Sequence, residues 1–315
     1  MSQTEIKFFP SRYPIVEALM NHASDLRLAV AVAEAGAFPS LWLPETADEA
    51  DACLTEFAKL TGHCNVIVPI LPWQHNKDVD NFFIENLDIM RVFRKHRVSH
   101  IEVLRLDNDG MDNDTIYKRA QFNKVCRVTK SLLPTVKLIM RIFDTVDDVS
   151  GIDAYAIKGK ESAGKTGNWA VKDLFVKKIQ SGTQKHLIPY GGIGTPEQVG
   201  DYIKQGATAV AVGTLFAASL ESPLSAEVKT KMINAGSVNL DCSNQHFQNQ
   251  LILDQENKID NDDWNRSQQL KQSMTGAGDR GFIYAGRSID HVNSVIPVKD
   301  IVEHLVSQLP KSDIK

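Results

Sequence analysis

One segment of this sequence contains residue types that are typical of phosphate binding. Residues 159–166 read GKESAGKT, which satisfies the pattern Gly-x-x-x-x-Gly-Lys-Thr, and they lie between an apolar run and a helical pattern. In such a loop the backbone N–H groups surround a phosphate, the lysine reaches the outer phosphates and the hydroxyl binds magnesium. Taken alone, the segment predicts a P-loop, so a nucleotide phosphohydrolase is one alternative for the function.

The rest of the chain supplies little that a P-loop enzyme needs. Such an enzyme requires an apolar strand that ends in an acidic residue for magnesium, and the nearest candidate, residues 251–254, lies far downstream in a polar region. Several predicted strands also precede the loop, whereas this fold type usually opens with it. A strand-to-helix turn that binds nothing is the other interpretation, in which Glu161 caps the following helix or pairs with Lys160.

A second pair of glycine-rich positions also predicts phosphate binding. Gly191 and Gly192 follow one apolar run, and Gly213 with Thr214 follows the next. In a (β/α)8 barrel, the loops after strands seven and eight form the usual phosphate site, where glycines let the phosphate approach the backbone. These four residues are therefore the predicted phosphate contacts.

The elements that must position these loops form a regular alternation of strands and helices. Short, β-branched apolar runs recur with amphipathic stretches between them, which is typical of a parallel sheet with crossover helices. We predict an α/β fold, a (β/α)8 TIM barrel with a C-terminal helical insertion. The expected strands are residues 14–18, 40–43, 65–71, 100–106, 136–143, 154–158, 186–190 and 209–212.

The domain organisation follows from where this alternation stops. Residues 1–222 are expected to form the barrel, residues 223–279 a helical insertion or lid, and residues 280–315 a segment that returns to the barrel. Only a short crossover, residues 144–153, separates the fifth and sixth strands, so the helix there is expected to be truncated.

Composition narrows the class of protein. The 315 residues are 43% hydrophobic and 23% charged with a net charge of −4, which is typical of a globular protein and does not suggest a nucleic-acid partner. The four cysteines form no CxxC pair, and the histidines, among them His22, lack the spacing of metal ligands, so we expect no metal. No apolar stretch is long enough to span a membrane, and we expect a cytoplasmic protein with no membrane partner.

With these motifs in view, the chain resembles the nitronate monooxygenase family, the 2-nitropropane dioxygenase-like flavin barrels that include the FMN-dependent enoyl-ACP reductases. The likeness extends over nearly the whole sequence at low identity. It is clearest in residues 14–21 (PIVEALMN), 28–36 (LAVAVAEAG), 153–167 (DAYAIKGKESAGKTG), 191–216 and 282–288 (FIYAGRS). The same loops account for Gly159 and Gly164, so the P-loop pattern needs only Lys165 and Thr166 in addition.

The resemblance implies an oxidoreductase that binds FMN at the carboxyl end of the barrel. It implies that the backbone at Met20 meets the flavin ring, that Asn65 touches the flavin, and that Lys158 faces it. Arg141 would supply a cation near the pyrimidine edge of the flavin, where positive charge stabilises the reduced anion. The remaining predicted cofactor contacts are Gly164, Gly191, Gly192, Gly213 and Thr214.

This chain departs from the family where the mechanism is concerned. Lys165 stands where monooxygenases of the family have a histidine, and an ordinary lysine stays protonated and stabilises an anion instead of exchanging protons near neutral pH. Lys165 is therefore the predicted catalytic residue, for a small-molecule or acyl-carrier-bound substrate. A flavin-barrel partner subunit without catalysis is a further alternative, and a homodimer is a possible assembly. Trp73 and His75 follow the third strand and could line the substrate pocket.

Overall fold

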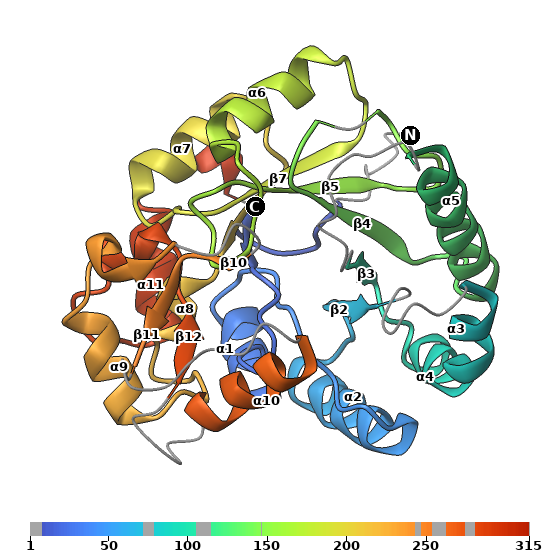
Figure 1. The fold of residues 1–315 in the computed structure, drawn as a ribbon, viewed down its shortest axis with the longest axis horizontal. Coiled ribbons are helices and arrows are strands. Elements are labelled where there is room, and N and C mark those ends of the chain that lie inside the picture. Colours follow the sequence, from blue (N-terminus) through green and yellow to red (C-terminus); the bar gives the residue numbers. More distant parts are fainter. Residues whose placement is uncertain are drawn as a thin grey trace.

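The computed structural model describes residues 8–71, 79–104, 115–145, 147–242, 247–253, 263–274 and 281–314. Its centre is a sheet of seven strands in the order β1-β8-β7-β5-β4-β3-β2, all paired in parallel (Figure 1). The strands are β1 (Ile15–Glu17), β2 (Ile67–Ile70), β3 (His100–Val103), β4 (Lys137–Ile142), β5 (Ala154–Lys158), β7 (His186–Tyr190) and β8 (Val210–Val212).

A short extended segment closes this sheet into a barrel. Phe38 bridges in parallel to Val16 of β1, and Ser40 bridges to Ile67 of β2. Backbone hydrogen bonds join both sides, since Glu17 N donates to Phe38 O at 2.8 Å and Leu41 N donates to Ile67 O at 2.8 Å. The predicted (β/α)8 barrel is therefore confirmed, although the second strand position lies at residues 38–40 and not at 40–43.

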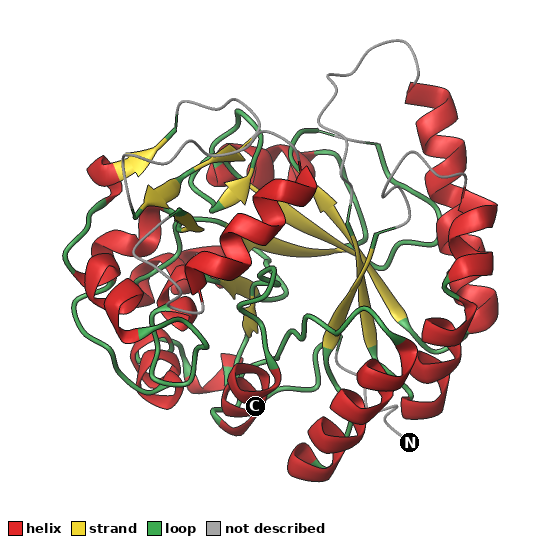
Figure 2. Ribbon diagram, turned by 60° about the horizontal axis from the view of Figure 1, so that its bottom comes forward, coloured by secondary structure: helices red, strands yellow, loops and turns green. Residues whose placement is uncertain are grey.

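The helices surround the barrel as the alternation predicts (Figures 1 and 2). Their starts follow from local chemistry: Asp25, Thr46 and Thr195 each cap a helix through a side-chain oxygen, and Thr195 forms a capping box with Gln198. No helix lies between β4 and β5 in described residues 143–145 and 147–153, as expected from that short crossover. The outer helices are α1 (Leu26–Glu34), α2 (Ala47–Thr61), α3 (Val79–Glu85), α4 (Leu87–His96), α5 (Thr115–Leu132), α6 (Val171–Gln180), α7 (Pro196–Lys204), α8 (Thr214–Ala217) and α11 (Val298–Leu305).

The interior of the barrel is closed at its amino-terminal end. Val16, Phe38, Ile67, Ile139 and Ile188 form a separate buried cluster together with Phe8 and Phe9. The two phenylalanine rings lie 5.1 and 5.0 Å from the His100 ring, whose Nε2 is 2.9 Å from the Phe8 carbonyl. Because this plug fills one end, a ligand can enter the barrel only from the carboxyl ends of the strands.

The segment after α8 forms a small structure of its own over that carboxyl end. It contains α9 (Ala226–Ile233), β9 (Leu240–Asp241), β10 (Phe247–Gln248), β11 (Gln250–Ile252), α10 (Asp263–Met274) and β12 (Phe282–Tyr284). Strands β12, β11 and β9 form an antiparallel sheet, and β10 pairs with β6 (Gly164–Lys165). The predicted boundary between the inserted segment and the C-terminal segment, at residue 279, stays a prediction. Strands β11 and β12 lie on opposite sides of this boundary and pair with each other. No helix in the described ranges is both long and apolar enough to cross a membrane.

A buried carboxyl group beside β1 makes stability depend on pH. Glu17 is fully buried, receives a hydrogen bond from Ser40 N at 3.0 Å, and has no salt-bridge partner among the described residues. Burial raises its pKa to about 8 from 4.5, with Asp25 adding to the rise and hydrogen bonds from Ser24 and Ser40 opposing it. Because the pKa of Glu17 is raised on folding, the protonated group contributes to the stability of the fold. This contribution is fully present below pH 4.5 and is lost as pH rises through about 8.

Glu17→Gln keeps the shape of this side chain without its charge. We expect the wild type to lose about 5 kcal/mol of unfolding free energy between pH 4.5 and mildly alkaline pH through this group, because one pKa unit corresponds to about 1.4 kcal/mol. The variant should lack that part of the pH dependence. Urea unfolding at a series of pH values measures it, and parallel profiles for the two proteins would show that Glu17 ionises normally.

Candidate functional site

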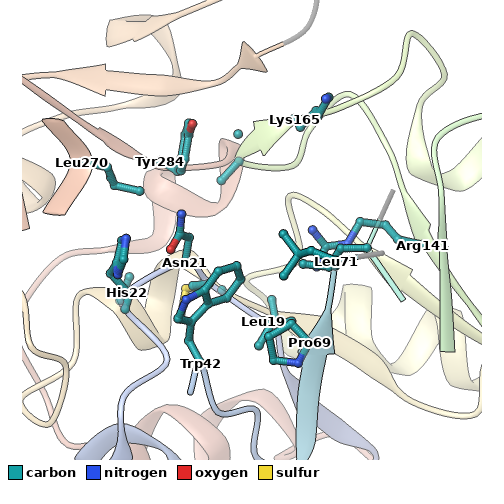
Figure 3. A pocket seen from close by; sticks show the side chains of 18 of the residues that line it. Leu19, Asn21, His22, Trp42, Pro69, Leu71, Arg141, Lys165, Leu270 and Tyr284 are labelled. Atoms are coloured by element: carbon teal, nitrogen blue, oxygen red, sulfur yellow. The ribbon is translucent and has the colours of Figure 1, made fainter. Parts of the chain in front are cut away.

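A cavity of about 780 Å³ opens at the carboxyl ends of the barrel strands. Its size lies within the range of small-molecule and cofactor sites. Figure 3 shows side chains that reach it from different parts of the chain: Leu19 and Asn21 after β1, Pro69 and Leu71 at the end of β2, and Arg141 on β4. Helix α10 adds Leu270, Lys271 and other residues at the mouth, so the inserted segment covers part of the opening.

The predicted phosphate residues meet on one side of this cavity. Gly191, Gly192, Gly213 and Thr214 all line it. Gly191 and Gly192 have φ angles of 122° and 69°, which side chains rarely adopt, and a Cβ on Gly192 would lie 2.9 Å from Glu161 Cβ. Helix α8 begins at Thr214, and the first N–H groups of a helix have no acceptor within it. This arrangement suits a phosphate.

The floor of the cavity carries a buried ionic cluster. Arg141 Nε donates to Glu102 Oε1 at 2.6 Å, and the Glu102 side chain has no exposed surface. The Tyr190 hydroxyl donates to the second Glu102 oxygen at 3.4 Å, and the Arg141 guanidinium lies 5.8 Å from the centre of the Tyr190 ring. Lys158 at the end of β5 is also buried and lines the cavity. The Glu102 carboxylate therefore pairs with Arg141 and also acts electrostatically on Lys158.

The electrostatics of this cluster favour an anionic ligand. Burial lowers the pKa of Lys158 well below its usual value, and the charges of Arg141 and Lys165 lower it further, while Glu102 opposes them. Burial and the Glu102 charge raise the pKa of Tyr190 well above its usual value, so this phenol remains a proton donor. Negative charge placed near Lys158 would favour the protonated form of this lysine and raise its pKa again.

The loop that carries Lys165 is not a P-loop. In a P-loop the helix starts directly at the lysine and hydroxyl residues, but here Gly164–Lys165 form β6 and α6 starts only at Val171. Glu161 caps that helix, since its Oε2 accepts a hydrogen bond from Val171 N at 3.0 Å. Asp254, the acidic residue that ends the candidate magnesium strand 251–254, lies outside the described residues, as do Trp73 and His75.

Residues of the inserted segment hold this loop in place. Strand β10 pairs antiparallel with β6, with Phe247 opposite Lys165 and Gln248 opposite Gly164. The next residue, Asn249, is 1% exposed and donates hydrogen bonds from Nδ2 to the carbonyls of Lys160 and Ser162. Lys165 itself lines the cavity. The position of Lys165 therefore depends on contacts with a distant part of the sequence.

Asn249→Gly tests this support without new backbone strain, because Asn249 already has a φ of 56°. Losing both donors leaves two buried carbonyls without these partners, which we expect to cost about 1 to 3 kcal/mol of unfolding free energy. Amide hydrogen exchange should accelerate in residues 160–166. Asn249→Asp keeps the volume but presents oxygens to the same carbonyls, so it should cost at least as much. Unchanged exchange in both variants would show that the contact does not hold the loop.

The cavity gathers nine of the ten residues predicted to form the site. Asn65 is the one it does not include. Asn65 precedes β2, whereas the cavity is lined by Pro69, Ile70 and Leu71 at the other end of that strand, about 13 Å away for four residues of extended chain. The prediction placed Asn65 from sequence likeness alone, and the strand direction puts it toward the wrong end of the barrel.

Several residues in or next to the cavity were not singled out from the sequence. Tyr190 lines the cavity and Glu102 accepts a hydrogen bond from its hydroxyl, although both lie on strands and look there like ordinary buried sheet positions. The alternation of inward and outward positions could have identified them. His22 and Trp42 also line the cavity, and only their place just after strand ends could have indicated it.

Comparisons with known proteins agree with this architecture. A family model described as nitronate monooxygenase matches residues 2–308. Among solved structures, the chain is similar to FabK from Thermotoga maritima, with a TM-score of 0.72 and 21% identity over 99% of this chain and 97% of that one. It is also similar to a nitroalkane oxidase from Streptomyces ansochromogenes, with a TM-score of 0.71 and 18% identity over 97% of both chains. No curated protein matches the sequence.

A third similar structure is the enoyl reductase domain of MlnA from the macrolactin biosynthesis cluster of Bacillus amyloliquefaciens. Its TM-score is 0.70 and its identity 12%, over 95% of this chain and 94% of that one. At these identities the structures establish the likeness of the folds.

Proposed function

Since the chain belongs to the nitronate monooxygenase family, we propose that it is an FMN-dependent oxidoreductase with its cofactor in the cavity at the carboxyl end of the barrel. The proposal rests on two features that lie in the same cavity. Glycine-rich strand ends suited to a phosphate lie on one side, and the Arg141 guanidinium and the buried Lys158 side chain lie at the floor. FMN combines a phosphate with a ring system whose pyrimidine edge takes negative charge when it is reduced.

The residues present fit such a cofactor. Gly191, Gly192, Gly213 and Thr214 would hold the phosphate through backbone N–H groups, and the Thr214 hydroxyl is already oriented by a hydrogen bond from Gly286 N at 2.9 Å. Met20 would lie against the ring beside Gly213, where a Cβ added to the glycine would lie 3.6 Å from Met20 Sδ. Bound flavin would supply the hydride or electron transfer that no side chain can perform.

The protein's own groups would orient the reactants and control charge. Glu102 holds Arg141 in one position across the barrel, so the positive charge at the floor is fixed before any ligand binds. Lys165, on the rim of the cavity near Tyr284 (Figure 3), would bind an anionic or carbonyl-bearing substrate. The inserted residues 223–279 would limit the access of water to the reacting groups.

The substrate class is proposed from the same charges. A cationic rim at Lys165 suits either the anion of a small acid or the carbonyl of a thioester on an acyl carrier. Solved structures of similar fold include a nitroalkane oxidase and an enoyl reductase domain, so both substrate classes need to be tested.

The first experiment is a visible absorption spectrum of the purified protein after FMN is added and the excess is removed. We expect a flavin spectrum, with FMN as the cofactor released on denaturation. Oxygen uptake with an alkyl nitronate, and NADPH oxidation with an enoyl thioester, then separate the two substrate classes. A failure to retain FMN at high concentration would contradict the proposal. Retention of FMN without turnover of either probe would favour a non-catalytic partner subunit.

Lys165→Ala separates substrate binding from cofactor binding. We expect the variant to retain FMN with less than a threefold change in Kd, because the phosphate contacts come from other loops. Turnover of the active probe should fall by about 10- to 100-fold in kcat/KM, equal to the loss of about 1.4 to 2.8 kcal/mol of interaction. FMN titration and steady-state kinetics measure the two effects. Equal losses of FMN affinity and of kcat/KM would mean that Lys165 supports the cofactor site instead.

A further inference from the structure

Lys158 is the last residue of β5, and its side chain faces the interior of the barrel. Side chains alternate between the two faces of a strand, and Ala156, two residues earlier, belongs to the buried cluster inside the barrel. In the parallel register Lys158 lies opposite Tyr190 of β7, and Tyr190 lies opposite Ala211 of β8. All three of these residues line the cavity. The amine of Lys158 is therefore carried at the floor of the cavity by a regular strand.

Three lysines in the described part of the chain are buried, and Lys158 differs from the other two. Lys178 donates a hydrogen bond to Asp148 Oδ1 at 2.7 Å, and Lys229 donates to the Ser222 carbonyl at 2.9 Å. Lys158 is 9% exposed, and it makes no hydrogen bond or ion pair with the described residues. Burying an ammonium group without such a partner costs far more free energy than burying a neutral amine. The burial of Lys158 therefore favours its uncharged form.

The charges that act on Lys158 come from three neighbouring strands. Arg141 of β4 and Lys165 of β6 are positive, and Glu102 of β3, which already pairs with Arg141, is negative. Burial lowers the pKa of Lys158 most, the two cations lower it further, and Glu102 opposes them. A lysine that is desolvated beside another cation is a nucleophile, because its lone pair is free to attack a carbonyl carbon.

No other amine that lines the cavity in the described ranges is placed in this way. Lys165 is half-buried and Lys271 is exposed, so water can hydrate their ammonium groups. Formation of an imine requires a primary amine, because the nitrogen gives up two hydrogens. This requirement excludes the remaining ionisable side chains of the cavity, which are His22, Glu45, Glu85, Arg141, Tyr190 and Tyr284.

The loop suited to a phosphate begins beside this amine. Gly191 and Gly192 directly follow Tyr190, the residue opposite Lys158. Gly159 N donates a hydrogen bond to Tyr190 O at 3.1 Å, so the loops after β5 and β7 start side by side. A single small compound can therefore contact the glycine-rich loops with a phosphate and the Lys158 amine with another group.

We propose that Lys158 forms an imine with small aldehydes or ketones that carry a phosphate group, in protein that holds no FMN. The amine lone pair attacks the carbonyl carbon, and the carbonyl oxygen then leaves as water together with both amine hydrogens. A carbon–nitrogen double bond joins the compound to Lys158, and nothing is oxidised or reduced. This activity goes beyond the proposed flavin function. FMN and the carbonyl compound would use the same glycine-rich loops, so each would exclude the other.

The test uses the purified chain before FMN is added, with glyceraldehyde 3-phosphate as the probe. Cyanoborohydride reduces an imine to a stable secondary amine, and mass spectrometry of the peptides then measures the label on each lysine. We expect Lys158 to be labelled at least about 10-fold faster than any other lysine at neutral pH, because each unit of lowered pKa raises the free-amine fraction about tenfold. The buried Lys178, held by Asp148, is the internal control and should stay unlabelled. Labelling of Lys158 no faster than that of exposed lysines would overturn the proposal.

The pH dependence of labelling separates a free amine from an ordinary ammonium group. From about pH 9 to about pH 7 an ordinary lysine should lose about 100-fold in rate, because its free-amine fraction falls by that factor. Lys158 should lose less than about 10-fold over the same range, because burial and the nearby cations keep it uncharged. Parallel profiles for Lys158 and the exposed lysines in one digest would overturn the proposal.

Glyceraldehyde, which lacks the phosphate, tests the ligand class. At equal concentration it should label Lys158 at least about 10-fold more slowly, equal to about 1.4 kcal/mol of binding free energy. Inorganic phosphate and FMN should each slow labelling by the phosphorylated probe. Lys158→Arg keeps a positive charge but forms no imine, so it should lose the fast phase of labelling in the whole protein. Equal rates for the two aldehydes, or a fast phase that persists in Lys158→Arg, would overturn the proposal.

The outcome is independent of the flavin proposal. Rapid labelling of Lys158 in a chain that does not retain FMN would support the imine and contradict the flavin function. Retention of FMN by a chain whose Lys158 reacts like an exposed lysine would contradict only the imine.

Discussion

Gly192→Asp is expected to lower the affinity for FMN by at least about 100-fold, equal to about 2.7 kcal/mol of binding free energy. Two effects act together. A carboxylate close to the proposed phosphate position repels it, by about 1 to 4 kcal/mol at 4 Å for two charges near a protein surface. The new Cβ would also lie 2.9 Å from Glu161 Cβ in a backbone with a φ of 69°, so the loop must shift. FMN titration followed by flavin fluorescence measures the loss.

The matched control for this variant is Gly182→Asp. Gly182 has a φ of 73°, nothing lies within 4 Å of a Cβ added to it, and it follows α6 away from the cavity. The control therefore introduces the same charge and the same backbone strain without touching the phosphate site, and it should retain FMN. Full FMN affinity in Gly192→Asp would show that the phosphate binds elsewhere.

Glu102→Gln should destabilise the protein strongly, although the change removes only one charge. It leaves Arg141, whose side chain is only 13% exposed, without its carboxylate partner at 2.6 Å, and it removes the negative charge that opposes the effect of Arg141 on Lys158. Breaking a buried ion pair from one side typically costs about 3 to 5 kcal/mol, because the remaining charge is not compensated. Urea unfolding of the protein without FMN measures the loss of unfolding free energy.

An exposed ion pair provides the comparison. Glu56 pairs with Lys59 at 3.1 Å on the surface of α2, and their side chains are 43% and 70% exposed. Glu56→Gln should change the unfolding free energy by less than about 0.5 kcal/mol, because water screens such a pair. Similar effects of the two substitutions would mean that water reaches Glu102 and that the barrel floor is not the closed ionic site described above.

The elements of this fold could be predicted because each is encoded locally. Thr195, Pro196 and Gln198 start α7 whatever surrounds them, and the β-branched run of residues 154–158 forms β5. The segment 38–40 was placed two residues too late, since its extended form is stabilised by β1 and β2 on either side and not by its own composition. Glycines at the ends of β7 and β8 indicated the phosphate side of the cavity for the same local reason.

The sequence by itself thus determined the alternating strands and helices, the barrel class and the glycine-rich strand ends, because periodicity, capping and backbone freedom act over a few residues. Only the tertiary structure decided that Gly164–Lys165 form a strand after a loop held by Asn249, that Asn65 lies outside the cavity, and that Glu102 pairs with Arg141. These are contacts between residues far apart in the chain. They depend on which face of each strand turns inward and on how the inserted segment packs, which no local pattern specifies.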